Sequence, residues 1–148
     1  MKLLAVVLTF CSITCVAQSD EAAVKQTINQ FFDGMRRGDS AEIKATLAPT
    51  IVFQTIIQKN DGSTIVETEQ VSDFIAAVTK PHPQVYDERV TFDLVKIDAA
   101  LATVWAPYKF YVGDTFSHCG VDAFQLVKLA GGWKIQYIID TRRKDACP

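Results

Sequence analysis

The sequence has few of the residues that build metal sites or nucleophilic active sites. Its 148 residues include only two histidines, His82 and His118, and neither lies in a spacing typical of metal ligands. A glycine-rich phosphate loop and a G-x-S-x-G turn are missing, and neither Asn29 nor Asn60 begins a glycosylation sequon. We therefore expect no metal site and no cofactor.

An excess of positive charge is missing as well. Seventeen acidic residues face 15 basic ones, which gives a formal net charge of −2. Nucleic acids and anionic membrane surfaces are bound by basic stripes, so neither is an expected partner. The chain also lacks the apolar run of roughly 20 residues that a membrane span needs, so we expect no stable membrane insertion.

The N-terminus has the pattern of an export signal. A positive start at Lys2 precedes the apolar segment 3–10, and Cys15 and Ala17 are small residues at the −3 and −1 positions before Gln18. We predict a signal peptide over residues 1–17, cleaved near Ala17, and one exported domain over 18–148, either periplasmic or secreted. The alternatives are a buried first strand or helix, or a lipidated cysteine, although the residues before Cys11 and Cys15 fit a lipoprotein signal poorly.

Cleavage at this position leaves two cysteines, Cys119 and Cys147. In an exported domain such a pair favours one disulfide, which would fasten the C-terminal tail to the sheet. The alternatives are a reactive thiol and a metal ligand.

The hydrophobic pattern predicts helices first and strands afterwards. Apolar spacing indicates a helix over Asp20–Arg37 closed by Gly38, a second helix capped by Asp39, and a short third one capped by Ser72. Strand-like segments cover 51–58, 64–68, 85–97, 101–112, 116–128 and 133–142. Most connections are too short for crossover helices, so we predict an α+β fold: a curved, mostly antiparallel sheet around about three N-terminal-half helices, with a cavity between the layers.

Several segments resemble a known superfamily. Residues 31–39 (FFDGMRRGD) resemble the first helix and turn of nuclear transport factor 2-like domains. Residues 105–111 resemble a central strand of the branch called "putative lumazine-binding", within the SnoaL-like group, and residues 117–124, 132–135 and 140–143 resemble its last two strands. The resemblance implies a cone-shaped sheet with a pocket at its open end. The branch name implies a pterin or flavin precursor as ligand.

This superfamily includes isomerases, dehydratases, epoxide hydrolases, polyketide cyclases and plain binding or assembly modules, so the resemblance leaves the function open.

Strand parity locates candidate site residues. Phe124 is on an apolar face, and a period of two places Asp122 and His118 on the same face. If the following turn pairs Lys128 with Trp133, then Phe124 lies opposite Tyr137 and Asp122 lies opposite Ile139. His118 and Asp122 are therefore the candidates for acid–base catalysis. Alternatively, Asp122 pairs with Arg142 or Arg143 or with backbone amides, and His118 lies at an exposed strand start.

Aromatic residues are the candidates for ligand binding, with Tyr108 as a polar contact on the neighbouring strand. The full set is Tyr108, Trp105, Phe53, Phe124 and Tyr137. The alternative is that such residues form the core or a dimer face. Arg142 and Arg143 could recognise a carboxylate or phosphate, or form a local salt bridge at a solvated strand end.

Three functions are compatible with these patterns. The leading hypothesis is an exported pocket protein that binds a small apolar or aromatic molecule. The second is an isomerase, dehydratase or hydrolase that uses His118 and Asp122 without a cofactor. The third is an interaction module that forms a homodimer through the sheet face. The sequence does not decide whether the protein is an enzyme.

Overall fold

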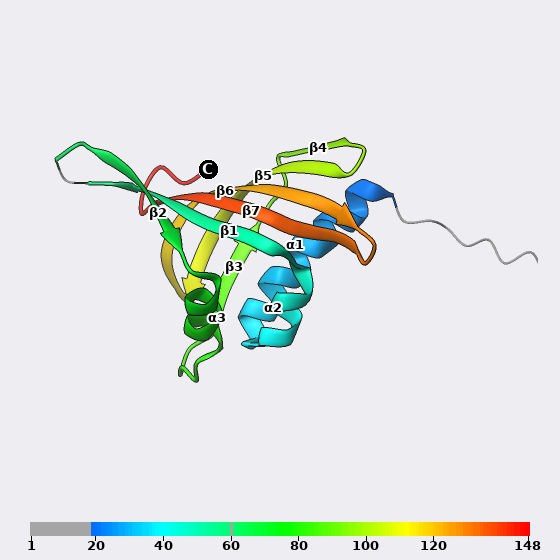
Figure 1. Cartoon of the computed structure of the whole chain (residues 1–148). Coiled ribbons are helices and arrows are strands. Elements are labelled where there is room, and N and C mark those ends of the chain that lie inside the picture. Colours follow the sequence, from blue (N-terminus) through cyan, green and yellow to red (C-terminus); the bar gives the residue numbers. More distant parts are fainter. Residues whose placement is uncertain (1–18, 60) are drawn as a thin grey trace, which may run out of the picture.

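The computed structural model describes residues 19–59 and 61–148, so the predicted signal peptide and its cleavage position lie outside the described residues. This part of the chain contains three helices and seven strands (Figure 1). In chain order they are α1 (Asp20–Arg37), α2 (Ser40–Thr46), β1 (Leu47–Gln58), β2 (Thr64–Glu69), α3 (Val71–Thr79), β3 (Tyr86–Val90), β4 (Leu94–Asp98), β5 (Leu101–Val112), β6 (Thr115–Leu129) and β7 (Gly132–Arg143).

The strands form one curved sheet in the order β2-β1-β7-β6-β5-β3, and β4 also pairs with β5. The pair β1–β7 is parallel, and the other pairs are antiparallel. All three helices lie on the concave side of the sheet (Figure 1). The predicted α+β class and mostly antiparallel sheet are confirmed.

The caps of the first two helices follow from the sequence. Ser19 accepts a hydrogen bond from the backbone N–H of Ala22, and Gly38 ends α1 with a left-handed φ of 64°. The Asp39 carboxylate accepts hydrogen bonds from two N–H groups of the first turn of α2, at 2.9 and 3.0 Å. The sharp turn between α1 and α2 lets both helices pack under the sheet.

Two predicted boundaries differ from the structure. The third helix begins at Val71 after Gln70, two residues earlier than a Ser72 cap requires. The predicted strand 85–97 is two strands, β3 and β4, which both pair with β5. They separate opposite Pro107, because proline has no N–H to donate to the neighbouring strand.

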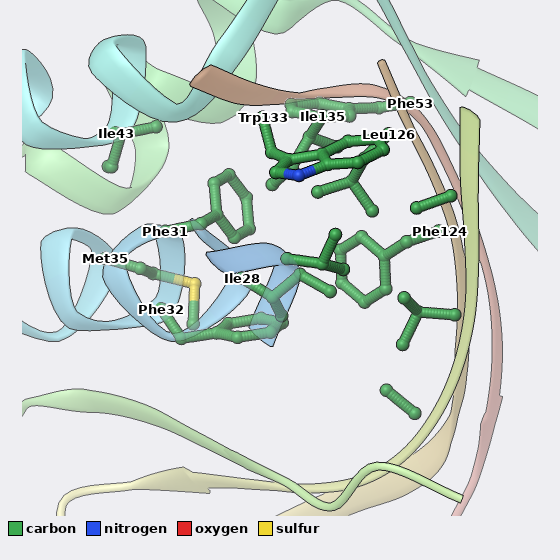
Figure 2. Packing of buried hydrophobic residues seen from close by; sticks show 14 of the residues in the cluster. Ile28, Phe31, Phe32, Met35, Ile43, Phe53, Phe124, Leu126, Trp133 and Ile135 are labelled. Atoms are coloured by element: carbon green, nitrogen blue, oxygen red, sulfur yellow. The ribbon is translucent and has the colours of Figure 1, made fainter. Parts of the chain in front are cut away.

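The core lies between α1 and the concave sheet face. One stripe of α1, which includes Ile28, Phe32 and Met35, packs against Phe124 and its neighbours on β6 and β7 (Figure 2). Phe124 is completely buried, and its ring meets Phe32 edge to face with the centroids 6.1 Å apart. This core fills one end of the space under the sheet, while the other end remains open.

A β-bulge changes the predicted register of β6 and β7. Lys128 lies opposite Trp133, as expected, and Leu126 lies opposite Ile135. The register then shifts by one residue at Gln136, so Phe124 lies opposite Ile138 and Asp122 lies opposite Asp140. The predicted positions of Tyr137 and Ile139 in this register are therefore wrong, because the extra residue reverses which side chains of β7 face inward.

Candidate functional site

A cavity of about 230 Å³ lies between the helices and the concave face of the sheet. Its apolar wall is formed mainly by Phe31, Phe32, Met35, Phe53, Phe74, Val78, Tyr86, Phe110 and Ile138. Its polar lining includes Glu69, Glu88, Tyr108, His118, Asp122, Asp140 and Arg142. The cavity therefore combines an aromatic wall with a cluster of titratable groups.

The buried centre of the polar cluster is a pair of carboxyl groups, Glu88 from β3 and Asp122 from β6. Asp122 is 4% exposed, and Glu88 is partly buried. Burial raises the pKa of Glu88 to about 7 despite a hydrogen bond with Asp122. Burial, the charge of Glu88 and the hydrogen bond with Glu88 raise the pKa of Asp122 well above its usual range. The pair therefore retains a proton near neutral pH.

A second polar group lies beside this pair. The Tyr108 hydroxyl lies 3.2 Å from Asp140 Oδ2 and 3.0 Å from the carbonyl oxygen of Thr141, both on β7. Arg142 Nε donates to the same Asp140 oxygen at 2.8 Å, and its Nη2 donates to Thr55 at 3.3 Å. Burial and the charge of Asp140 raise the pKa of Tyr108, so the phenol stays protonated and donates.

Gly120 allows Tyr108 to reach across β6. Tyr108 and Gly120 are opposite residues of β5 and β6. A Cβ atom at position 120 would lie 1.7 Å from the carbonyl oxygen of Thr141 and 2.9 Å from Tyr108 Cε1. Glycine is therefore the residue that lets the tyrosine ring lie over the strand and bond to β7.

His118 lies at the edge of the cavity and is partly buried. Its Nδ1 lies 3.0 Å from Ser117 Oγ, and its ring centroid is 4.9 Å from that of Phe110. Burial first, and then the charge of Arg142, lower the pKa of His118, so its ring is neutral at neutral pH. The residue hydrogen-bonded to Asp122 is Glu88 rather than His118, Arg142 or Arg143.

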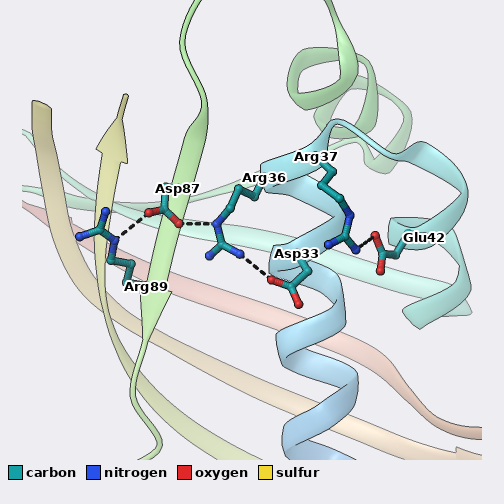
Figure 3. Close-up of polar contacts among 6 residues, drawn as sticks. All are labelled: Asp33, Arg36, Arg37, Glu42, Asp87 and Arg89. Carbon is teal, nitrogen blue, oxygen red and sulfur yellow. Dashed lines mark hydrogen bonds and ion pairs between the residues drawn. The ribbon is translucent and has the colours of Figure 1, made fainter. Parts of the chain in front are cut away.

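Ion pairs fix β3, which carries Glu88, against α1. Asp87 lies between two arginines (Figure 3). Its Oδ1 is 2.6 Å from Arg36 Nε, and its Oδ2 is 2.7 Å from Arg89 Nε. Arg36 also contacts Asp33 on its own helix. Burial by itself would raise the pKa of Asp87, but the hydrogen bonds from Arg89 and Arg36 outweigh it and lower this pKa. The network holds the backbone that places Glu88 in the cavity.

The predicted site residues separate into two groups. His118, Asp122, Tyr108 and Phe53 line the cavity. Phe124 belongs to the buried core, Trp105 is 48% exposed, and the Tyr137 hydroxyl donates to Gln54 at 2.6 Å. These three residues do not line the cavity.

The sequence patterns identified neither Glu88 nor Asp140 as a candidate site residue. Alternation along the strand could have identified Glu88, because Tyr86 and Val90 pack against the core and residues two positions apart in a strand point to the same face. Asp140 had no such signal, since its inward position depends on the bulge at Gln136.

The structure joins Cys119 on β6 to Cys147 in the tail, with sulfurs 2.00 Å apart. In residues 19–59 and 61–148, no group of three side chains is arranged to hold a metal ion. No helix in that part of the chain is long and apolar enough to cross a membrane.

Solved structures with the same fold come from several bacteria. A nuclear transport factor 2-like protein of unknown function from Shewanella baltica is 12% identical, with a TM-score of 0.63 over 85% of this chain and 95% of that one. A domain of unknown function with a cystatin-like fold from Nostoc punctiforme is 17% identical, with a TM-score of 0.64 over 88% and 82%. A conserved protein from Planctomyces limnophilus is 16% identical, with a TM-score of 0.65 over 84% and 96%.

A search of curated proteins finds no significant match. A family model described as "Putative lumazine-binding" matches residues 19–137, which include the whole fold up to the middle of β7. The chain therefore belongs to the "Putative lumazine-binding" family and has the fold of nuclear transport factor 2-like proteins.

Proposed function

We propose that this protein binds a small, largely flat organic molecule in the cavity under the sheet. The observation that carries the proposal is the composition of the cavity: aromatic rings form one wall, and hydrogen-bonding groups line the rest. Phe74 stacks on Phe31 with centroids 5.7 Å apart and meets Phe53 edge to face at 5.0 Å. Such a wall suits a ring system, and the polar groups would fix its orientation.

The volume limits the size of the ligand. A cavity of about 150 Å³ in a protein core accommodates benzene. At about 230 Å³, this cavity has room for a substituted single ring or a compact two-ring molecule. The family description names lumazine, and a two-ring heterocycle of that kind agrees with this size.

We further propose that the domain is exported. The N-terminal pattern of a charged start, an apolar segment and a small-residue exit supports this, and so does the Cys119–Cys147 disulfide, since such bonds persist in oxidising compartments. A fusion of residues 1–25 to a reporter that is active only after export would test the signal. A reporter retained in the cytoplasm would refute this proposal.

A second candidate function is acid–base catalysis, favoured by the carboxyl pair. With the pKa of Glu88 near 7, this group can accept or return a proton at neutral pH, while Tyr108 supplies a donor nearby. The acid–base pair would then be Glu88 with Asp122, and His118 would contribute to the cavity wall.

Native mass spectrometry of the protein, purified from an oxidising compartment, tests the binding proposal. We expect a monomer mass increased by a small organic molecule, and the excess mass should disappear on gentle activation. A bare, stable dimer would contradict the proposal and favour an interface through exposed sheet residues such as Trp105 and its cross-strand neighbour Leu94.

A further inference from the structure

The charges in the cavity are unbalanced. Four of its lining residues are acidic: Glu69, Glu88, Asp122 and Asp140. Among the described lining residues, Arg142 is the one arginine or lysine, and its guanidinium is already bonded to Asp140. Arg142 is also 53% exposed at the cavity mouth, where water screens its charge. Glu88 and Asp122 therefore have no basic side chain of their own.

One oxygen of the pair lacks a donor. Asp122 Oδ2 is fully buried and receives no hydrogen bond from any donor in the described part of the chain. A hydrogen bond between Glu88 and Asp122 forms only if one of the two carboxyl groups keeps a proton. A buried carboxylate oxygen without a donor is costly, so a ligand that supplied an N–H group to it would gain a strong interaction.

The other groups facing the pair do not provide this donor. His118 on β6 is neutral at neutral pH and bonds to Ser117, and Tyr108 on β5 directs its hydroxyl to β7. Glu69 on β2 lies at the exposed edge of the cavity and adds negative charge. On β7, the cation of Arg142 and the anion of Asp140 largely offset each other.

The aromatic wall favours the same kind of ligand. Tyr86 lies on β3 together with Glu88, and Phe110 lies on β5 opposite His118, with the two ring centroids 5.8 Å apart. Their ring faces attract cations, and this attraction grows when water is excluded. A flat ligand with a protonated nitrogen would therefore find aromatic surface on one side and carboxylates on the other.

From the unbalanced charge, the donor-free Asp122 oxygen and the aromatic wall, we infer that the cavity selects a flat organic cation, such as an amidine or a protonated nitrogen heterocycle. The cation binds Glu88 and Asp122. This inference rests on the proposed binding function and specifies its ligand class. Binding releases the proton that the empty pair holds, because both carboxylates are stabilised as anions beside the cation.

Three probes of nearly equal shape test the ligand class: benzamidine as the cation, benzamide as the neutral molecule and benzoate as the anion. Titrations followed by amide shifts in NMR spectra would give affinities and identify the residues contacted. We expect benzamidine to bind at least about tenfold more tightly than benzamide, and benzoate to bind most weakly. Benzamidine affinity should rise between about pH 5 and pH 8, while benzamide affinity stays constant.

Three variants complete the test. Asp122→Asn and Glu88→Gln should each bring benzamidine affinity to within about threefold of benzamide affinity, whereas Asp98→Asn, which removes an exposed charge on β4, should change neither. Glu88→Gln, at the partly buried member of the pair, keeps the test valid if Asp122→Asn does not fold.

The two proposals fail in different ways. Equal affinity for benzamide and benzamidine, or tighter binding of benzoate, would overturn the cation selectivity and leave the binding function intact. If none of the three probes shifts a residue that lines the cavity, both proposals are overturned.

Discussion

Two neighbouring carboxyl groups in a partly apolar cavity cannot both ionise at low cost. A buried charge needs a partner of opposite charge, but the arginine that lines this cavity, Arg142, is bonded to a third carboxylate, Asp140. Glu88 and Asp122 therefore retain a proton that they would lose in water. This arrangement lowers stability and leaves hydrogen-bonding capacity free for a ligand.

The first prediction concerns the pH dependence of stability. Glu88 has a pKa of about 7 in the folded protein, above its value in the unfolded chain, so the folded state binds the proton more tightly. The free energy of unfolding should therefore fall as the pH rises from about 5 to 8. Glu88→Gln should reduce this fall by about 2 kcal/mol, measured by urea denaturation at several pH values.

In this experiment, Glu67→Gln is the matched control, because Glu67 is exposed on β2 and outside the cavity. Parallel pH profiles for the wild type and Glu88→Gln would show that the carboxyl pair does not hold its extra proton.

The second prediction concerns Gly120. Gly120→Ala should lower the free energy of unfolding by about 3 kcal/mol or more, because the new methyl group collides with backbone as well as with Tyr108. Thermal unfolding followed by circular dichroism would measure the loss. Gly131→Ala is the control, since its Cβ would meet only Lys134 Cε at 3.9 Å and should change stability by less than about 0.5 kcal/mol. An equally mild effect at both positions would contradict the close approach at Gly120.

At the scale of elements, two irregularities build the site. The bulge at Gln136 turns Asp140 inward to face Asp122, and it turns Tyr137 away to bond with Gln54. The interruption opposite Pro107 separates β3 from β4, and β3 is then fastened to α1 through Asp87. Since Glu88 is the next residue along β3, the ion pairs of Asp87 indirectly position the carboxyl pair.

The third prediction concerns this fastening. Asp87→Asn should lower the free energy of unfolding by about 1 kcal/mol at neutral pH, because Arg36 and Arg89 each lose one charged partner. The pKa of Asp87 is lowered in the folded protein, so its contribution is present above the unfolded pKa and disappears as the pH falls through the folded one. Denaturant titrations at about pH 7 and pH 3 should show a smaller difference at the lower pH. Asp93→Asn, at an exposed residue after the same strand, should be neutral at both.

At the scale of the whole molecule, the fold leaves one end of the sheet's concave side filled and the other open. The large side chains of α1 fill the end where β6 and β7 carry Phe124 and Trp133 (Figure 2). At the other end, Phe31 and Met35 line the cavity, and the sheet side of this cavity carries both aromatic and charged residues. The C-terminal tail is fixed to β6 by Cys119–Cys147 and does not line the cavity.

The fourth prediction concerns the disulfide, which closes a loop with a sequence separation of 28. Its reduction should lower the free energy of unfolding by about 3 kcal/mol, because the unfolded chain gains freedom. Ligand affinity should not change. Cys147→Ser should reproduce both results, and an unchanged denaturation midpoint after reduction would indicate that the bond is not formed in the purified protein.

The sequence by itself determined the helices, the antiparallel strands and the caps at Gly38 and Asp39, because these depend on local periodicity and on residues a few positions apart. Strand parity also placed Asp122 and His118 on one face of their strand, and both residues line the cavity. The sequence did not predict that Glu88, Asp122 and Asp140 lie together. Glu88 and Asp122 are on strands separated by β5, and Asp140 lies opposite Asp122 only because of a one-residue bulge in β7. Pairing between distant strands depends on packing over the whole sheet, so only the tertiary structure decided the composition of the site.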